Sequence, residues 1–194
     1  MKNLLFGMAT FFMLSSNLYT QDYSVPTRIF KRGQTDIQIG YGLFTGAKIM
    51  DKADTKFPPL SFRGDRFMGD HFSLGVSYTI ASHQSQPFII PDGIEQRITN
   101  TTHQMAVRPT FHMTSLKKMD LYGGMLIGLN FEEFKIDQGT TTYMQEHKNF
   151  QPQRTKVIYS AFVGSRYVLS KNWSVFSELG FSTALLMVGI GYRI

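Results

Sequence analysis

From Gln34 onward, apolar and polar residues alternate with a period of two over most of the chain. Ile37, Ile39 and Tyr41, for example, are separated by Gln38 and Gly40. No stretch of helical length carries apolar residues at the three-to-four spacing of an amphipathic helix. Successive side chains of a β-strand point to opposite faces, so this alternation predicts half-buried strands and an all-β fold.

About eight such strands follow one another. The alternating segments are residues 36–43, 60–68, 72–80, 104–111, 121–132, 154–169, 172–181 and 184–194. In the last segment one continuous apolar face is formed by Ala184, Leu186, Val188, Ile190, Tyr192 and Ile194. Pro109 interrupts the fourth segment, and because proline cannot donate a ladder hydrogen bond we expect a β-bulge there.

The connections between these segments alternate in length. Short turns fall at residues 69–70, 114–118 and 170–171 and near Ser182, whereas long polar connections cover residues 48–59, 84–102 and 137–153. An even number of strands, with short turns on one side and long loops on the other, is typical of closed antiparallel barrels in the outer membrane. We therefore expect an eight-stranded transmembrane barrel with periplasmic turns and extracellular loops.

The charged residues indicate which face of each strand is enclosed. If the apolar faces contact lipid, the lumen receives four arginines and four acids: Arg63, Arg108, Arg166, Arg193, Asp36, Asp65, Glu132 and Glu178. Arginine suits enclosed pairing because its planar guanidinium can bond a carboxylate at two points. The lysines fall in loops, turns and strand ends. We predict a structural charge network in which Arg166 pairs with Glu178, and Arg193 with Asp36.

Aromatic residues near strand ends suggest a girdle at each membrane interface. Toward the turns these are Phe72, Tyr167, Trp173 and Tyr192, and toward the loops Phe44, Tyr78, Tyr159 and Phe181. Aromatic packing in the core of a soluble ligand-binding barrel is the alternative explanation.

The first residues have the organisation of a secretory signal peptide, with Lys2 followed by an apolar stretch over residues 4–14. We expect residues 1–20 to be the signal peptide, residues 21–33 a periplasmic segment and residues 34–194 the barrel domain. A chain of 194 residues has room for one such domain. There is no cysteine, which excludes disulfides and thiolate chemistry. The net charge of +6 is spread over loops, so no nucleic-acid partner is expected.

Few residues of the sequence form patterns typical of catalytic or metal sites. None of the five histidines has a partner at the spacing of metal ligands, so we predict no metal site. Histidines 83 and 103 flank the second long connection, near Ser82, Ser85 and Glu95, in a weak hydrolase-like constellation. We predict no catalytic residue, no cofactor and no enzymatic activity. A lipid-modifying enzyme of the outer membrane remains an alternative.

Residues 154–194 resemble the last hairpins of small, porin-like outer-membrane β-barrel proteins of Bacteroidetes-type Gram-negative bacteria. The resemblance rests on residues 163–167 (VGSRY), 169–172 (LSKN) and 177–180 (SELG), with residues 58–60 (PPL) and 120–128 (DLYGGMLIG) in support. Gly189, Tyr192 and the terminal hydrophobe also resemble the signal read by the barrel-assembly machinery, although Ile194 replaces the usual terminal aromatic residue.

This resemblance implies a location in the outer membrane, with outer-membrane lipid and the barrel-assembly machinery as partners. We expect a monomer with a structural role or a loop-based role in binding an extracellular ligand. A barrel this narrow is normally filled by its own side chains, so no wide pore is expected.

Overall fold

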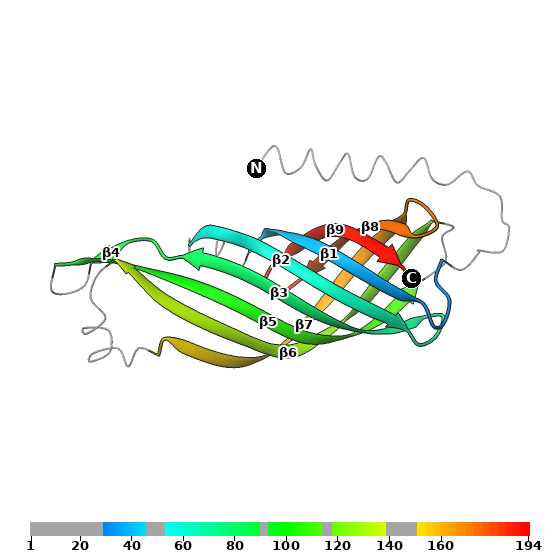
Figure 1. Cartoon of the computed structure of the whole chain (residues 1–194), viewed down its shortest axis with the longest axis horizontal. Helices are drawn as coiled ribbons and strands as arrows, with labels where there is room; N and C mark the ends of the chain where they lie inside the picture. The colour runs from blue at the N-terminus through cyan, green and yellow to red at the C-terminus, as the bar shows by residue number, and fades with distance from the viewer. Residues whose placement is uncertain (1–28, 46–52, 90–92, 114–117, 139–150) are drawn as a thin grey trace.

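The computed structural model of the chain describes residues 29–45, 53–89, 93–113, 118–138 and 151–194. Within them, eight long strands form one closed antiparallel sheet, as Figure 1 shows. Each long strand pairs with the next along the chain, and the last pairs with the first. The strands are β1 (Thr35–Phe44), β2 (Asp54–Phe67), β3 (Phe72–Gln84), β5 (Glu95–Met113), β6 (Met119–Gln138), β7 (Gln153–Val168), β8 (Trp173–Gly180) and β9 (Leu186–Arg193). The predicted eight-stranded β-barrel is confirmed.

A short additional strand, β4 (Phe88–Ile89), pairs only with the start of β5. No helix in the described ranges has the length and apolar composition needed to cross a membrane.

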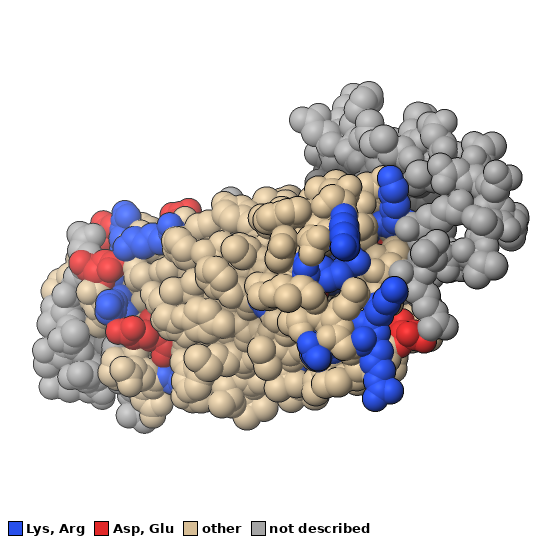
Figure 2. Space-filling model, turned by 45° about the vertical axis from the view of Figure 1, so that its right-hand side comes forward, with Lys and Arg blue, Asp and Glu red and all other residues tan. Residues whose placement is uncertain are grey.

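The alternation places apolar side chains on the outside of the barrel and polar ones inside. Ile37, Val76 and Val107 are between 46% and 63% exposed, whereas Asp36 and Ser77 are buried. Figure 2 shows the result as a broad uncharged band, with charged residues gathered toward the two ends of the molecule. At the turn end, Trp173 and Tyr192 are exposed and their rings meet edge to face at 5.0 Å. This arrangement inverts that of a soluble barrel, as the sequence predicted.

Strands at the loop end are longer than predicted. Much of residues 84–102 and part of 137–153 were expected to be loops, yet β5 begins at Glu95 and β6 continues to Gln138. The reason is visible in residues 99–102 (TNTT), where polar residues occupy both faces of the strand and no alternation marks it. Ala184 also departs from the prediction: it precedes β9 and is buried beside Phe176 and Met187 instead of facing outward.

Pro109 does not produce the predicted bulge. It lies opposite Leu74 in an unbroken β3–β5 register. On the β6 side, the pairs Val107–Ile127 and Thr110–Gly124 have the same register, with no ladder pair between them. Proline has no N–H to donate, and the ladder between β5 and β6 is interrupted at this point. The register of β5 does not shift, because its pairing with β3 on the other side is unbroken.

The segment before β1 closes the turn end of the barrel. A turn at residues 31–34, with Gly33 at a φ of 89°, lets the chain reverse into β1. Phe30 is only 1% exposed and its ring stacks on Phe67 at 4.3 Å. Ile29 and Phe30, expected in the periplasmic segment, thus pack against the barrel interior, whereas residues 31–33 are exposed. The expected signal peptide and residues 21–28 lie outside the described residues.

Sterics at Gly128 provide a test of this packing. A Cβ atom added there would lie 2.6 Å from the Cα and Cβ of Ala106 on β5, whereas one added at Gly64 would meet nothing within 4 Å. We expect Gly128→Ala to lower the free energy of unfolding by about 1–3 kcal/mol. Gly64→Ala, the matched control, is expected to change it by less than about 0.5 kcal/mol. Urea unfolding in detergent measures both, and equal effects would contradict the β5–β6 packing.

Candidate functional site

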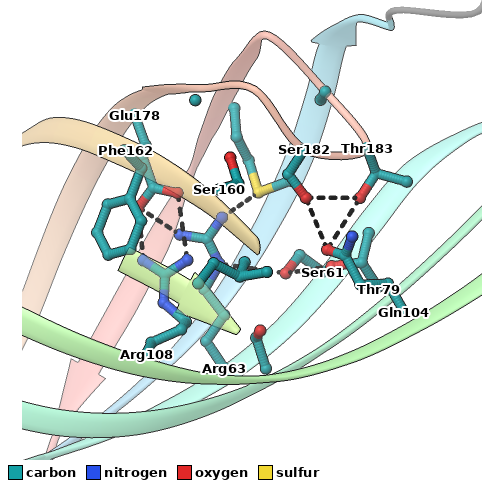
Figure 3. Close-up of a pocket in the computed structure, with 15 residues that line it drawn as sticks. Ser61, Arg63, Thr79, Gln104, Arg108, Ser160, Phe162, Glu178, Ser182 and Thr183 are labelled. Atoms are coloured by element: carbon teal, nitrogen blue, oxygen red, sulfur yellow. Dashed lines mark hydrogen bonds and ion pairs between the residues drawn. The ribbon is translucent and has the colours of Figure 1, made fainter. Parts of the chain in front are cut away.

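The centre of the lumen is occupied by one carboxylate and two guanidinium groups. Glu178 of β8 accepts hydrogen bonds from Arg63 of β2 at 2.9 Å and from Arg108 of β5 at 2.7 Å. A second hydrogen bond, from Arg108 Nη1 to Glu178 Oε1 at 3.3 Å, makes the Arg108–Glu178 interaction bidentate. All three side chains are buried, and Figure 3 shows them converging from separate strands. We call these three residues the central cluster.

Aromatic rings fill the space around the central cluster. The guanidinium of Arg108 lies 4.0 Å from the centre of the Phe162 ring, and that of Arg63 lies 5.1 Å from Phe176. The Tyr122 hydroxyl adds a long hydrogen bond of 3.4 Å to Glu178. Ring faces attract cations, so these contacts help to stabilise the second positive charge that the single carboxylate leaves uncompensated.

A second charged group lies nearer the turn end. Arg166 of β7 forms an ion pair with Asp36 of β1 at 3.0 Å. Gln38 donates from Nε2 to Asp36 at 2.9 Å and to Asp65 at 2.6 Å, so one amide joins two carboxylates.

Phe30 lies against this second group. The guanidiniums of Arg166 and Arg193 sit 4.9 and 4.4 Å from the Phe30 ring centre, and Arg193 donates to the carbonyl of Ile29 at 2.7 Å. Ile29 and Phe30 are therefore held in place by charged side chains of the lumen.

The structure places the predicted network residues as follows. Six are buried in the lumen, namely Arg63, Arg108, Arg166, Asp36, Asp65 and Glu178, while Arg193 and Glu132 are half-buried toward opposite ends. Glu132 pairs with Lys156 at 2.8 Å near the loop end.

The predicted partners, in contrast, are wrong. The predicted register holds, because Arg166 lies opposite Phe176, but Arg166 binds Asp36 and Glu178 binds two other arginines. Arg193 is the ladder neighbour of Asp36, yet its guanidinium donates a hydrogen bond to the carbonyl of Ile29. Inside a narrow barrel, long side chains reach across the lumen, so the neighbouring strand does not determine the partner.

A buried serine, histidine and aspartate form a chain that sequence reasoning missed. The Ser73 hydroxyl lies 2.8 Å from Nε2 of His112, and Nδ1 of His112 lies 2.8 Å from Asp120. These residues come from β3, β5 and β6, so only the strand register could have brought them together. These three side chains have the hydrogen-bond connectivity of a hydrolytic triad. However, Ser73 and Asp120 are 0% exposed, and Phe67 covers the His112 ring at 4.8 Å.

The weak constellation around His83 and His103 is not assembled. His83 points inward and is buried, whereas His103 lies on the outer face and contacts the Tyr78 hydroxyl at 2.7 Å. Ser82 bonds Thr101, and Glu95 pairs with Arg97. The described residues contain no group of three or more metal-binding side chains.

The loop-end interior is open and polar. A pocket of about 390 Å³, which we call the outer vestibule, has a floor in which Gln104 accepts from Ser182 at 2.8 Å and donates to Asn130 at 3.1 Å. Figure 3 shows the contacts among Gln104, Ser182 and Thr183 beside the central cluster. Other residues lining the vestibule are His83, Asn100, Thr102, Glu132, Val157, Ile158, Tyr159, Ser160 and Phe181.

Beyond the apolar band, Asp137 ties together the extended strands. It accepts hydrogen bonds from Thr99, from Lys56 at 3.1 Å and from Gln84 at 2.6 Å, which join β2, β3, β5 and β6. Outward-facing apolar residues of β6 end at Phe131, and Glu133 and Lys135 follow, so Asp137 lies outside the membrane-facing band. The hydrogen bonds from Thr99 and Lys56 hold the pKa of Asp137 below its ordinary value.

Comparisons with known proteins show the fold of the chain and not its family. No family model matches the chain, and neither does any curated protein sequence. A structure from a study of de novo designed transmembrane β-barrels is 13% identical, covers 85% of this chain and 98% of its own, and gives a TM-score of 0.52.

Two natural barrels are also similar. Ail, the attachment invasion locus protein of Yersinia pestis, solved with the heparin analogue sucrose octasulfate, is 16% identical over 84% of this chain and 99% of its own, with a TM-score of 0.47. The outer membrane protein OprG of Pseudomonas aeruginosa is 14% identical over 84% and 97%, with a TM-score of 0.48. The chain has the fold of a transmembrane β-barrel.

The central cluster generates a double-mutant prediction. We expect Glu178→Ala to lower the free energy of unfolding by about 3–5 kcal/mol, because it leaves two buried guanidiniums without their carboxylate. Arg108→Ala is expected to lower it by less, because Glu178 keeps its ion pair with Arg63. The double variant is expected to lose clearly less than the sum of the two, by about 1 kcal/mol or more. Arg166→Ala with Glu178→Ala is the comparison cycle and should show weaker coupling, because these side chains have different partners. Additivity in the Arg108–Glu178 cycle would contradict the cluster.

Proposed function

We propose that this chain is a monomeric, porin-like barrel of the bacterial outer membrane whose lumen is sealed and whose function is to bind an extracellular ligand at the loop end. The exposed apolar band supports the membrane location, because a water-soluble barrel would not leave Ile37, Val76 and Phe111 40% or more exposed on one continuous surface. Outer-membrane lipid would cover that band, and the barrel-assembly machinery would insert the chain. The resemblance of residues 154–194 extends this proposal to Bacteroidetes-type barrels.

One observation carries the proposal: the two halves of the lumen differ. The turn-end half holds Phe30 on Phe67, then the Arg166–Asp36 group, then the central cluster. The loop-end half contains the outer vestibule, with free volume of about 390 Å³. A solute entering from outside would meet a polar pocket and then a set of paired charges. This contrast favours binding over transport.

Conductance in planar bilayers tests the sealed lumen. We expect the folded protein, verified by heat-modifiable gel mobility, to give no large steady conductance, because two layers of paired charges and the Phe30–Phe67 stack occupy the lumen. The variant Arg108→Ala/Glu178→Ala keeps the Arg166–Asp36 pair and the Phe30–Phe67 stack, so we expect it to give no large steady conductance either. Large steady currents from the unaltered protein would overturn the proposal.

A hydrolase is a second candidate function, favoured by the Ser73–His112–Asp120 chain alone. Its hydrogen-bond connectivity fits a nucleophile, a base and an orienting carboxylate. A substrate has no access to these three residues, because the rings of Phe30, Phe67 and Tyr122 all contact the His112 ring. We propose that Ser73, His112 and Asp120 have a structural role, in which the imidazole joins β3, β5 and β6. We propose that the protein is not an enzyme.

Labelling with a fluorophosphonate probe separates these roles. We expect no labelling of the folded protein, because the Ser73 hydroxyl is fully buried. Labelling that Ser73→Ala abolishes and Ser77→Ala preserves would establish a reactive serine and contradict the structural role.

A further inference from the structure

The barrel wall is incomplete at the loop end. β7 pairs with β6 from Gln153 to Tyr167, but pairs with β8 only from Phe162 to Val168. β1 ends at Phe44 and pairs with β2 only from Leu60 onward. Within the described ranges, no strand therefore lies between the upper parts of β7 and β2, above the β8–β9 hairpin. Figure 1 shows the short β8 and β9 beside the longer strands.

This opening in the wall lies at the level of the membrane. The β6–β7 register places Val157 opposite Leu129 and Tyr159 opposite Ile127. Leu129 and Ile127 are 39% and 50% exposed and belong to the apolar band on the outside of the barrel. The opening beside Val157 and Tyr159 therefore faces the hydrocarbon of the loop-end leaflet, and lipid is what it meets.

The outer vestibule extends through this opening. Its lining includes Ile158 and Ser160, whose side chains point into the barrel, and also Val157 and Tyr159, whose side chains point outward. A pocket that touches both faces of one strand must pass around the edge of that strand. The vestibule is thus connected to the membrane-facing side of the barrel at β7.

The hairpin at the base of the opening also has one polar and one apolar side. Phe181 is 82% exposed and lines the vestibule, whereas the next residue, Ser182, donates to Gln104 inside the barrel at 2.8 Å. Figure 3 shows Ser182 and Thr183 pointing toward Gln104. The vestibule is therefore apolar where it meets the membrane and polar where it enters the lumen.

The polar wall of the vestibule comes from β3, β5 and β6 and consists of His83, Asn100, Thr102, Gln104, Asn130 and Glu132. A hydrocarbon chain alone would leave these groups without hydrogen bonds, at a cost in free energy. A wholly polar solute would not match the apolar side chains at the opening. A ligand with a polar head and an apolar chain matches both parts.

Two atoms of the polar wall have no hydrogen-bond partner among the described residues. They are Nδ1 of His83 and Oδ1 of Asn100, and both atoms are buried. The two residues are ladder partners on β3 and β5, so they lie side by side. An amide oxygen can only accept, and a neutral imidazole has one accepting nitrogen. Hydroxyl groups on a ligand head would supply the missing donors.

The vestibule offers no unpaired charge to a ligand. Glu132 is the one carboxylate among the described lining residues, and the ammonium of Lys156 compensates it at 2.8 Å. The imidazole of His83 is mostly uncharged at neutral pH. A charged head would lose its hydration here without gaining a counter-charge, so an uncharged head fits best.

We propose that the outer vestibule binds an uncharged amphiphile from the loop-end leaflet of the membrane. Its hydroxyl-bearing head bonds to the polar wall at His83 and Asn100, and its chain leaves through the opening over Tyr159 and Phe181. The volume of about 390 Å³ is near the lower end of the range for small-molecule sites, which suits a small head. The inference rests on the proposed binding function and names the chemical class of the ligand.

Photo-crosslinking of the whole protein in nanodiscs tests the site. The probe is a monoacylglycerol, with a glycerol head and one acyl chain that carries a diazirine near the head. We expect crosslinks to residues 157–161 and to Phe181 to exceed those to Val76 and Val107, elsewhere in the apolar band, by about tenfold or more. Even labelling around the barrel would mean ordinary lipid contact and would overturn the proposal.

Competition separates the head from the chain without any variant. Unlabelled monoacylglycerol should displace the probe from the opening. The methyl ester of the same fatty acid has no hydroxyl, and the acylglycerol phosphate has a charged head, so each should compete about tenfold less well or worse. Equal competition by the methyl ester would show that the polar wall binds no head, and equal competition by the phosphate would contradict the uncharged head.

Asn100→Leu tests where the head lies. It removes an amide whose oxygen has no partner among the described residues, and should weaken displacement by monoacylglycerol about threefold or more. Thr101→Val, the matched control, changes the next residue on β5, whose hydroxyl bonds Ser82, and should leave displacement unchanged. Heat-modifiable gel mobility verifies that both variants fold. Equal displacement in both would contradict the head position.

The two proposals fail separately. Displacement of the probe by free glycerol as effective as that by monoacylglycerol would contradict entry from the membrane, while loop-end binding would stand. A large steady conductance would instead contradict the sealed lumen and leave the crosslinking pattern unaffected.

Discussion

A carboxylate enclosed in a narrow barrel must find its hydrogen-bond donors across the lumen, and Glu178 finds them on β2 and β5. The two guanidiniums in turn need ring faces beside them, which Phe162 and Phe176 supply. Because three strands that are not neighbours meet at this point, the contact fixes distances across the barrel that the ladder leaves open. Without Glu178, two buried cations would face each other, at a cost of several kcal/mol.

The packing of the lumen also explains how the strands of the barrel can differ in length at the loop end. The central cluster, the Arg166–Asp36 pair and Phe30 fill the turn-end half, where every strand is paired on both sides. The loop-end half does not depend on a packed lumen: Asp137 joins β2, β3, β5 and β6 through their side chains, and β8 and β9 end early. A packed lower half thus supports an upper half with an open pocket, the feature that the proposed binding function needs.

Periodicity predicted the fold class, the strand order and the inside–outside assignment, because a period of two is a strong signal wherever one face meets lipid. It underestimated strand length at the loop end, where residues such as Thr99–Thr102 are polar on both faces. It identified which charges lie in the lumen but not their partners, as Arg166 and Glu178 show. Likewise, Ser73, His112 and Asp120 come together only through the register of three strands, which no local pattern reveals.

Solvent exchange of the arginine side chains in the folded protein tests the closed lumen most directly. In nanodiscs transferred to D₂O, the guanidinium protons of Arg63 and Arg108 should remain observable by NMR long after those of Arg66, which is exposed and bonds only Thr35 among the described residues. Exchange of Arg63 and Arg108 as fast as that of Arg66 would show that water passes through the centre of the barrel, and would contradict the account.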